Sequence, residues 1–177
     1  MSFRQQVAEI SGQQVTLCFQ CSKCSAGCPV ADKMDLKPAQ VMHNICLGHK
    51  DAVLRCQAIW LCVGCETCSG RCPQQVEPAE AMNAARILAL REGIRPSVRD
   101  VGIFYRTFVG NLRLNGRIHD VALAGIARLL SGHLIEDIPL GWKLLVRRRI
   151  KLPSVSGLGG DFRRLYARAQ EREKGNE

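Results

Sequence analysis

The chain has 177 residues and a mass of 19.6 kDa, which predicts one ordinary domain, or one small domain with an extension, and excludes a large multidomain enzyme. Hydrophobic residues make up 46% and charged residues 23%, which excludes wholesale disorder, and only 5% are aromatic, so aliphatic and sulfur-containing side chains must fill the core. The formal net charge is +9, and the ten cysteines are the outlying feature of the composition.

The N-terminal residues 1–10 lack the apolar run of a secretory leader, and the longest stretch without a charge, residues 10–22, has only 13 residues. A membrane-spanning helix needs about 20 apolar residues, so the sequence predicts no membrane span. We therefore expect a cytoplasmic protein. In that reducing compartment, clustered cysteines serve metals or catalysis more often than disulfides.

Two cysteine runs share one pattern. A short helix ending at Gly12 is expected to lead into the first run, C-x2-C-x2-C-x3-C-P at residues 18–29, and the second occupies residues 62–73, so equivalent cysteines are 44 residues apart. In this pattern three thiolates of one loop bind one cubane iron–sulfur cluster, and the cysteine before proline reaches across to the other. The sequence therefore predicts two [4Fe–4S] clusters, one bound by Cys18, Cys21, Cys24 and Cys72, and the other by Cys62, Cys65, Cys68 and Cys28.

Two alternatives to this interpretation are zinc and a single cubane beside a degraded second site. Zinc prefers two Cys-x-x-Cys pairs from separate hairpins around a tetrahedral ion, and three cysteines per loop fit that arrangement poorly. Glycines at positions 27, 64 and 70 are expected to let the backbone approach inorganic sulfur closely. The doubled cysteine-proline run favours two cubanes.

Six further residues of metal-binding type lie outside the two runs. Cys46 and Cys56 fall in helix-like stretches and are interpreted as core residues, with a redox or ligand role as the alternative. The histidines show no metal-ligand spacing with one another, so surface or packing roles are expected for His43, His49, His119 and His133.

The linker between the runs is predicted to be helical, which argues against a β-rich bacterial ferredoxin. Asp35 is expected to cap a helix that has Pro38 in its first turn and ends at Gly48, and a second helix is expected from Asp51 to about Ile59. After the second run, a strong helix is predicted to open at residues 77–78 and to close at Gly93.

Beyond Pro96, apolar residues recur at helical spacing over residues 101–112 and 118–130, and both stripes are interpreted as core stripes. Two more helices are predicted, at residues 138–149 and 161–173, joined by a flexible linker at 153–160 that suggests a mobile or docking tail. The expected fold class is all-α. Residues 1–96 would form a helical cluster-binding domain, and residues 97–177 a basic helical extension for subunit docking.

The positive charge is concentrated in the second half. Residues 1–96 hold 10 Lys or Arg and 8 Asp or Glu, a formal charge of +2, whereas the rest hold 15 and 8, a formal charge of +7. The densest basic cluster is Arg147, Arg148 and Arg149 with Lys151, interpreted as a solvated helix end or as a docking site for an acidic partner protein. No nucleic-acid partner is expected, because no recognised nucleic-acid motif accompanies the cluster. Lys23 and Arg71, inside the cysteine loops, could raise cluster potentials.

The sequence carries no fingerprint of a substrate site of its own. Residues 157–160 resemble a dinucleotide loop only faintly, because Phe162 occupies the third glycine position and no strand precedes it. A Walker loop is absent, and no nucleophile and base are grouped outside the runs. The chain is therefore expected to carry electrons without its own catalysis.

These motifs resemble the C subunit of heterodisulfide reductase, strongly over about residues 5–95. The segments that carry the resemblance are LCFQCSKCSAGCPV at 17–30, LKP at 36–38, IWLCVGCETC at 59–68 and RCP at 71–73. The resemblance implies an α-helical ferredoxin fold with two [4Fe–4S] clusters bound by the eight motif cysteines. It also implies two partners, a flavin-containing A subunit that supplies electrons and a cysteine-rich B subunit that holds the substrate site.

The favoured function is that of an electron-relay protein within a larger complex, which passes single electrons between a flavoprotein and a partner acting on a disulfide-type substrate. One alternative is the iron–sulfur subunit of another oxidoreductase complex, of the glycolate-oxidising, succinate-oxidising or sulfur-oxidising heterodisulfide reductase-like type. The succinate type would need a further cysteine pattern upstream, and only 17 residues precede Cys18. The other alternative is a non-redox module in which the metal is a structural clip.

Overall fold

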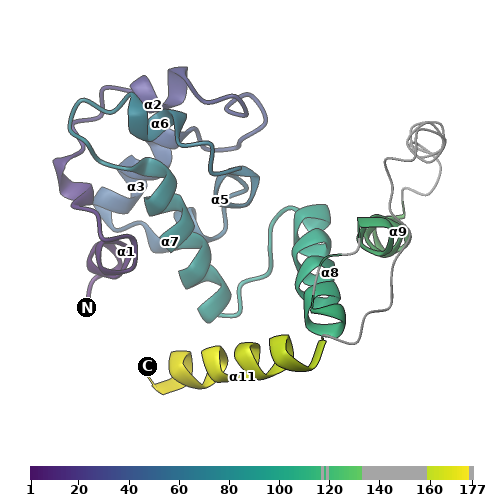
Figure 1. Cartoon of the computed structure of the whole chain (residues 1–177). Coiled ribbons are helices and arrows are strands. Elements are labelled where there is room, and N and C mark those ends of the chain that lie inside the picture. The colour runs from purple at the N-terminus through teal and green to yellow at the C-terminus, as the bar shows by residue number, and fades with distance from the viewer. Residues whose placement is uncertain (117, 119, 133–158, 176–177) are drawn as a thin grey trace. The chain divides into compact units, whose positions relative to one another are not determined.

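The computed structural model describes residues 1–116, 118, 120–132 and 159–175 (Figure 1). Over these residues the secondary structure is helical, with no strand, so the predicted all-α class is confirmed. The chain divides into two compact units, Met1–Val101 and Gly102–Glu177, which are described separately. Among the described helices, none is both long and apolar enough to cross a membrane.

The first unit opens with helix α1 (Phe3–Ser11) and the 3₁₀ turn η1 (Val15–Leu17), which leads directly into the first cysteine run. The Ser2 hydroxyl accepts a hydrogen bond from the Gln5 amide, and the Gln5 side chain accepts one from the Ser2 amide, so a capping box begins α1. The helix ends before Gly12, as predicted.

Four short helices follow: α2 (Lys23–Ala26), α3 (Pro38–Leu47), α4 (Lys50–Leu54) and α5 (Ala58–Leu61). Helix α3 has the predicted Pro38 in its first turn and ends before Gly48. The predicted cap is wrong, because Lys37 occupies the N-cap position of α3.

The single helix predicted from Asp51 to Ile59 is also wrong, because the chain breaks between α4 and α5. The Asp35 carboxylate accepts hydrogen bonds from the amides of Gln57 (2.7 Å) and Ala58 (2.9 Å) on one side of this break. On the other side, the Ser97 hydroxyl donates to the carbonyl of Arg55 at 2.6 Å. Distant side chains therefore satisfy the backbone groups that a continuous helix would have paired internally.

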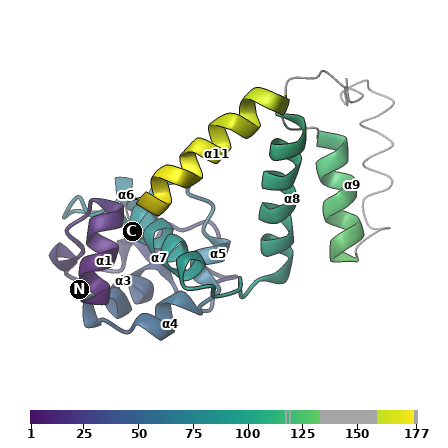
Figure 2. The same cartoon turned by 90° about the horizontal axis from the view of Figure 1, so that it is seen from below.

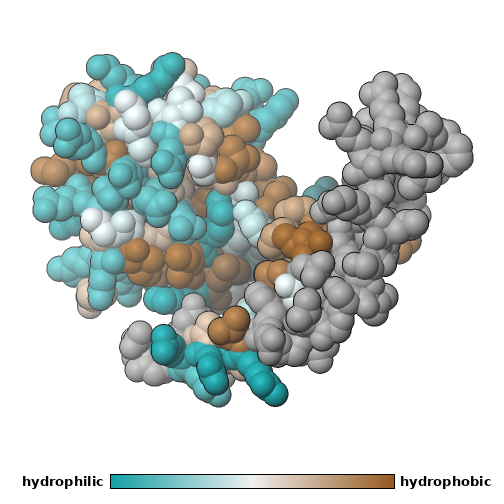
Figure 3. Space-filling view, in the orientation of Figure 1, coloured by the Kyte–Doolittle hydropathy of each residue, from teal (hydrophilic) through white to brown (hydrophobic). Residues whose placement is uncertain are grey.

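Helices α6 (Thr67–Gly70) and α7 (Pro78–Arg91) complete the first unit. The predicted helix after the second run is confirmed as α7, which packs against α1, α3, α4, α5 and α6; α1, α3 and α7 lie together in both views (Figures 1 and 2). The core is aliphatic and sulfur-rich, as the composition predicted. Its largest fully buried side chains include Val7, Met42, Ile45, Leu54, Ile59 and Met82. Polar side chains cover most of the face of this unit seen in Figure 3, with fewer apolar ones between them.

Three helices account for the rest of the described chain: α8 (Arg99–Asn115), α9 (Asp120–Ser131) and α11 (Gly159–Gly175). They confirm helices over the two apolar stripes and over 161–173, but the linker prediction is wrong at residues 159–160, which are helical. The core interpretation of the stripes is wrong for several side chains, since Phe104, Ile126 and Leu129 are 46%, 46% and 66% exposed. The predicted helix 138–149, the basic cluster 147–151 and linker residues 153–158 lie outside the described residues.

Candidate metal centres

The two cysteine runs fold into two loops of the same shape. Helices α2 and α6 lie 44 residues apart, like the cysteines, and each begins after a residue in the left-handed conformation, Ser22 (φ 61°) or Glu66 (φ 57°). Two residues earlier the chain is left-handed again, at Gln20 (φ 61°) and Gly64 (φ 64°). Non-glycine residues adopt this conformation rarely, so its recurrence shows that the sequence repeat is a structural repeat.

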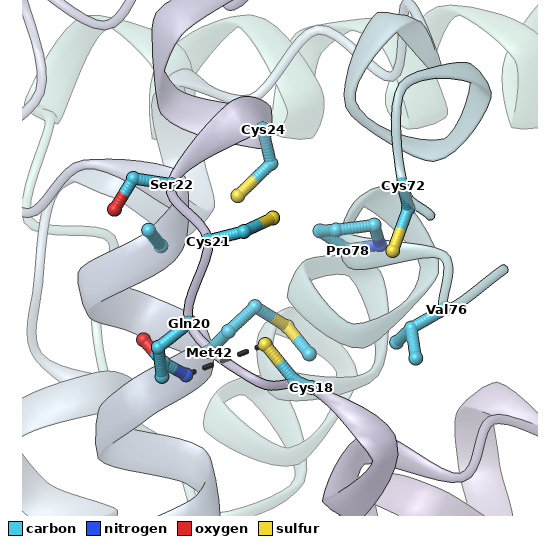
Figure 4. Close-up of a pocket in the computed structure, with 10 residues that line it drawn as sticks. Cys18, Gln20, Cys21, Ser22, Cys24, Met42, Cys72, Val76 and Pro78 are labelled. Atoms are coloured by element: carbon cyan, nitrogen blue, oxygen red, sulfur yellow. Dashed lines mark hydrogen bonds between the residues drawn. The ribbon is translucent and has the colours of Figure 1, made fainter. Parts of the chain in front are cut away.

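The first loop surrounds a cavity that the second loop closes (Figure 4). Cys18, Cys21 and Cys24 line it from the first loop, and Cys72 lines it from the end of the second. The remaining lining is largely apolar, including Met42 of α3 and Pro78 of α7, and the empty volume is about 330 Å³. The structure thus brings together the four cysteines predicted for the first cluster.

The second cavity repeats the first with the loops exchanged. Cys62, Cys65 and Cys68 line it from the second loop, Cys28 lines it from the end of the first, and its empty volume is also about 330 Å³. Met82 of α7 and Pro38 of α3 replace Met42 and Pro78. The four cysteines predicted for the second cluster therefore also lie around one cavity.

The donor set in each cavity fits an iron–sulfur cluster. All ten cysteines are free, and the four sulfur ligands available in each cavity are the number that a [4Fe–4S] cluster takes. In the described part of the chain, no three His, Cys, Asp or Glu side chains form a group suited to a single metal ion. In Figure 4 the four thiols stand around the first cavity instead of meeting at one point. The assignment of these cysteines as ligands stays a prediction.

Each cavity has a buried inner thiol and an exposed outer thiol. Cys24 and Cys68 are buried, and together with Ala39 and Ala79 they form a small apolar cluster between the two cavities. Burial raises the pKa of both of these thiols. Cys21 and Cys65 are exposed, and a hydrogen bond with the Thr67 hydroxyl lowers the pKa of Cys65. The two sites therefore approach each other inside the protein and meet solvent on their outer sides.

Residues 17–77 match the family described as 4Fe-4S dicluster domain. Three curated relatives, all C subunits, also match. That of the H(2):CoB-CoM heterodisulfide,ferredoxin reductase of Methanothermobacter thermautotrophicus is 29% identical over 103 residues, 58% of this chain and 56% of the relative. The iron-sulfur C subunit of the CoB–CoM heterodisulfide reductase of Methanopyrus kandleri is 35% identical over 79 residues, 45% of this chain and 41% of the relative. That of the Ferredoxin:CoB-CoM heterodisulfide reductase of Methanosarcina acetivorans is 37% identical over 78 residues, 44% and 31% of the two chains.

The resemblance to the C subunit of heterodisulfide reductase is confirmed. This chain spans from about a third to just over half of the length of these relatives. The dicluster match and the relatives together support an iron–sulfur protein with an electron-transfer role. The dicluster match covers both cysteine runs, and with them all eight cysteines that line the two cavities.

The structure shows the immediate surroundings of three glycines in the loops. A side chain at Gly27 would meet the Arg71 side chain at 2.7 Å, so this glycine leaves room for an arginine of the other loop. Gly64 provides a left-handed turn. Nothing lies within 4 Å of the position that a side chain at Gly70 would take. The expected close approach of these glycines to inorganic sulfur stays a prediction.

Of the remaining cysteines and histidines, the four that the structure describes line neither cavity. Cys56 is 4% exposed and belongs to the main core, which confirms its core interpretation. Cys46 is half-buried, and its thiol donates a hydrogen bond to the carbonyl of Val15 at 3.2 Å. His43 and His49 are exposed, and His119 and His133 lie outside the described residues.

The sequence prediction missed two residues that contact the loops. The Gln20 side chain donates a hydrogen bond to the sulfur of Cys18 at 3.3 Å (Figure 4). Arg86 of α7 donates to the carbonyls of Ile59 (2.8 Å) and Cys62 (2.9 Å). The position of Gln20 inside the first run was a usable signal. The position of Arg86 was not, because its partners lie 24 and 27 residues away along the chain.

Proposed function

We propose that this chain is the electron-transfer iron–sulfur subunit of a heterodisulfide reductase-type complex, relaying single electrons through two [4Fe–4S] clusters. The observation that carries the proposal is the crossed grouping of eight cysteines around two similar cavities. In the proposal, one cluster is held by Cys18, Cys21, Cys24 and Cys72, and the other by Cys62, Cys65, Cys68 and Cys28. Residues 1–96 form the cluster-binding domain, and residues 97–177 are a docking extension.

Each bound cluster supplies a one-electron couple. The protein's part is to hold the sites close together, to exclude water from their inner sides, and to leave their outer sides open. The buried thiols of Cys24 and Cys68, which belong to one small cluster with two alanine side chains, suit transfer between the sites. The exposed thiols of Cys21 and Cys65 suit exchange with partners at the surface. No separate catalytic group is needed for this relay.

The proposed partners are a flavin-containing A subunit, which supplies electrons, and a cysteine-rich B subunit, which holds a site for a disulfide-type substrate. The support is the naming of the relatives as C subunits of CoB–CoM heterodisulfide reductases. The complex is proposed to be cytoplasmic and to involve no nucleic acid. Mixing the purified components should give substrate reduction that depends on this chain, whereas a purified chain that turned over a disulfide unaided would contradict the relay role.

The cluster content is tested on anaerobically purified protein. We expect about eight iron and eight sulfide per chain, and zinc without sulfide would refute the proposal. The crossed ligand sets are tested with paired substitutions. Cys72→Ser combined with Cys21→Ser disturbs one cluster, so it should lose no more iron than the more damaging single variant. Cys72→Ser combined with Cys65→Ser disturbs both clusters and should lose about twice as much.

The opposite pattern in those double variants would show that each loop holds its own four ligands. Cys46→Ser is the matched control, because Cys46 lines neither cavity. It should retain both clusters. Electron paramagnetic resonance of the reduced protein gives an independent measure, since loss of one cluster also removes the magnetic coupling between the two.

A further inference from the structure

The structural repeat extends beyond the loops to the helices behind them. Helix α3 and helix α7 contribute equivalent residues to the two cavities, offset by 40 positions: Pro38 and Pro78, Ala39 and Ala79, and Met42 and Met82. The next residue one turn further along each helix is Cys46 in α3 and Arg86 in α7. A neutral thiol and a cation therefore occupy the same place at the two sites.

These two residues make the same contact. The Cys46 thiol donates to the carbonyl of Val15 at 3.2 Å, and the Arg86 Nε donates to the carbonyl of Ile59 at 2.8 Å. Val15 and Ile59 are themselves equivalent, each three residues before the first cysteine of its run. Arg86 adds a second bond, from Nη2 to the carbonyl of Cys62 at 2.9 Å. Both side chains therefore hold in place the backbone segment that leads into a cysteine loop.

The Cys46 and Arg86 side chains differ in charge. An arginine stays protonated at every physiological pH, whereas a thiol that donates a hydrogen bond is neutral. Arg86 is half-buried, so solvent screens its charge less than that of an exposed side chain. Arg4, which contacts the Cys46 carbonyl at 3.4 Å, is exposed and therefore more strongly screened. A reduced cluster carries one more negative charge than an oxidised one, so a fixed cation beside it favours reduction.

We propose that Arg86 is a positioning residue of the second site that also raises the reduction potential of that site through its charge. Cys46 fastens the first site without this electrostatic effect. The inference rests on the proposed function, because it requires both cavities to hold clusters. It concerns the contribution of Arg86 alone: Glu66, which lines the second cavity, and Gln20, which bonds Cys18, act on the potentials independently and are unchanged in the test.

The test is a redox titration of the whole chain, followed by electron paramagnetic resonance, on Arg86→Met, Arg86→Lys and two controls. In Arg86→Met, one of the two reduction waves should move to lower potential by about a tenfold change in the reduction equilibrium, which is about 59 mV for one electron. It should be the wave that Cys65→Ser diminishes, and not the one that Cys21→Ser diminishes. Arg86→Lys should keep most of the wild-type potential.

The controls distinguish the effect of the Arg86 charge from the effect of its hydrogen bonds to the loop. Arg91→Met removes a cation from the exposed end of the same helix and should leave both waves in place. Cys46→Ser keeps a hydrogen-bond donor to the Val15 carbonyl and adds no charge, so it should also leave both waves in place. Equal shifts in Arg86→Met and Arg86→Lys, or no shift in a fully loaded Arg86→Met, would overturn the inference. If Arg86→Met loses the second cluster, Arg86→Lys decides: a wild-type potential supports the charge effect, and a lowered potential refutes it. Wild-type protein without two clusters would instead refute the proposed function.

Discussion

Asp35 offers the sharpest test of how the segment before the second cysteine loop is held in place. Its carboxylate accepts hydrogen bonds from the amides of Gln57 and Ala58, which have no acceptor within the helix at the start of α5, just ahead of Cys62. Substitution by alanine removes both bonds, together with the one that the carboxylate accepts from the Leu36 amide at 2.8 Å, and leaves three amides without their acceptor. A hydrogen bond to a charged group contributes about 1.5–3 kcal/mol, and loss of a helix cap costs about 0.5–2 kcal/mol.

Because Asp35 itself is exposed, its bonds together should contribute about as much as one bond within the first range, and we expect Asp35→Ala to lower the free energy of unfolding by about 2 kcal/mol. For a unit of about 100 residues this corresponds to a decrease in Tm of about 8–16 °C. The assay is anaerobic thermal unfolding of the whole chain, followed by far-ultraviolet circular dichroism.

Asp32→Ala is the matched control for this prediction. Asp32 lies three residues away, and its ion pair with Lys33 spans 3.8 Å between side chains that are 72% and 77% exposed. Such surface pairs contribute about 0–1 kcal/mol, so the control should unfold close to the wild type. If the two alanine variants unfold within about 2 °C of each other, Asp35 does not hold the break between α4 and α5.

Three further predictions concern the loops and the core. Gly64→Ala should lower the stability by about 1–2 kcal/mol because φ at this position is +64°, whereas Gly70→Ala, in open helical surroundings, should not; equal Tm values would contradict this. Ser25→Ala should lower the free energy of unfolding by about 1 kcal/mol, because the Ser25 hydroxyl accepts a hydrogen bond from the Ala39 amide at 2.9 Å. An unchanged Tm would refute this role. Burial raises the pKa of Cys56, so less of its thiol is ionised at a given pH. Iodoacetamide labelling of Cys56, followed by mass spectrometry, should therefore stay slow near pH 8 and accelerate only at higher pH. Rapid labelling at neutral pH would contradict the burial.

The features predicted best from the sequence were those encoded within a few consecutive residues. The helix ends at Gly12 and Gly48 and the opening of α7 at Pro78 depend on local backbone chemistry, and the structure confirms them. The crossed neighbourhoods of Cys28 and Cys72 could also be anticipated, because a three-residue spacing turns the fourth thiol away from its own loop.

The errors arose where a distant residue changed a local preference. Asp35 precedes a proline helix and looks like its cap, but two amides 22 and 23 residues away bind it instead. The break between α4 and α5 is stable because Asp35 and Ser97 satisfy its amides and carbonyls, and neither contact is visible in residues 51–59. The exposed Phe104 and Leu129 show the same limit, since helical periodicity identifies an apolar face but not what covers it.

In the proposed relay, each cluster site has a buried side and a solvent-exposed side, because one of its thiols is buried and another is exposed. On the proposed ligand sets, each cluster would have one ligand in the buried group of Cys24, Cys68, Ala39 and Ala79, and one ligand exposed to solvent. Transfer between the sites would then cross a short, dry layer of small side chains, whereas transfer to a partner would use the side of Cys21 or Cys65. Ala79→Leu would enlarge that layer, so it should slow electron equilibration between the clusters. Because Ala79 also lines the second cavity, cluster content is measured first, and an unchanged rate in a fully loaded variant would show that the path lies elsewhere.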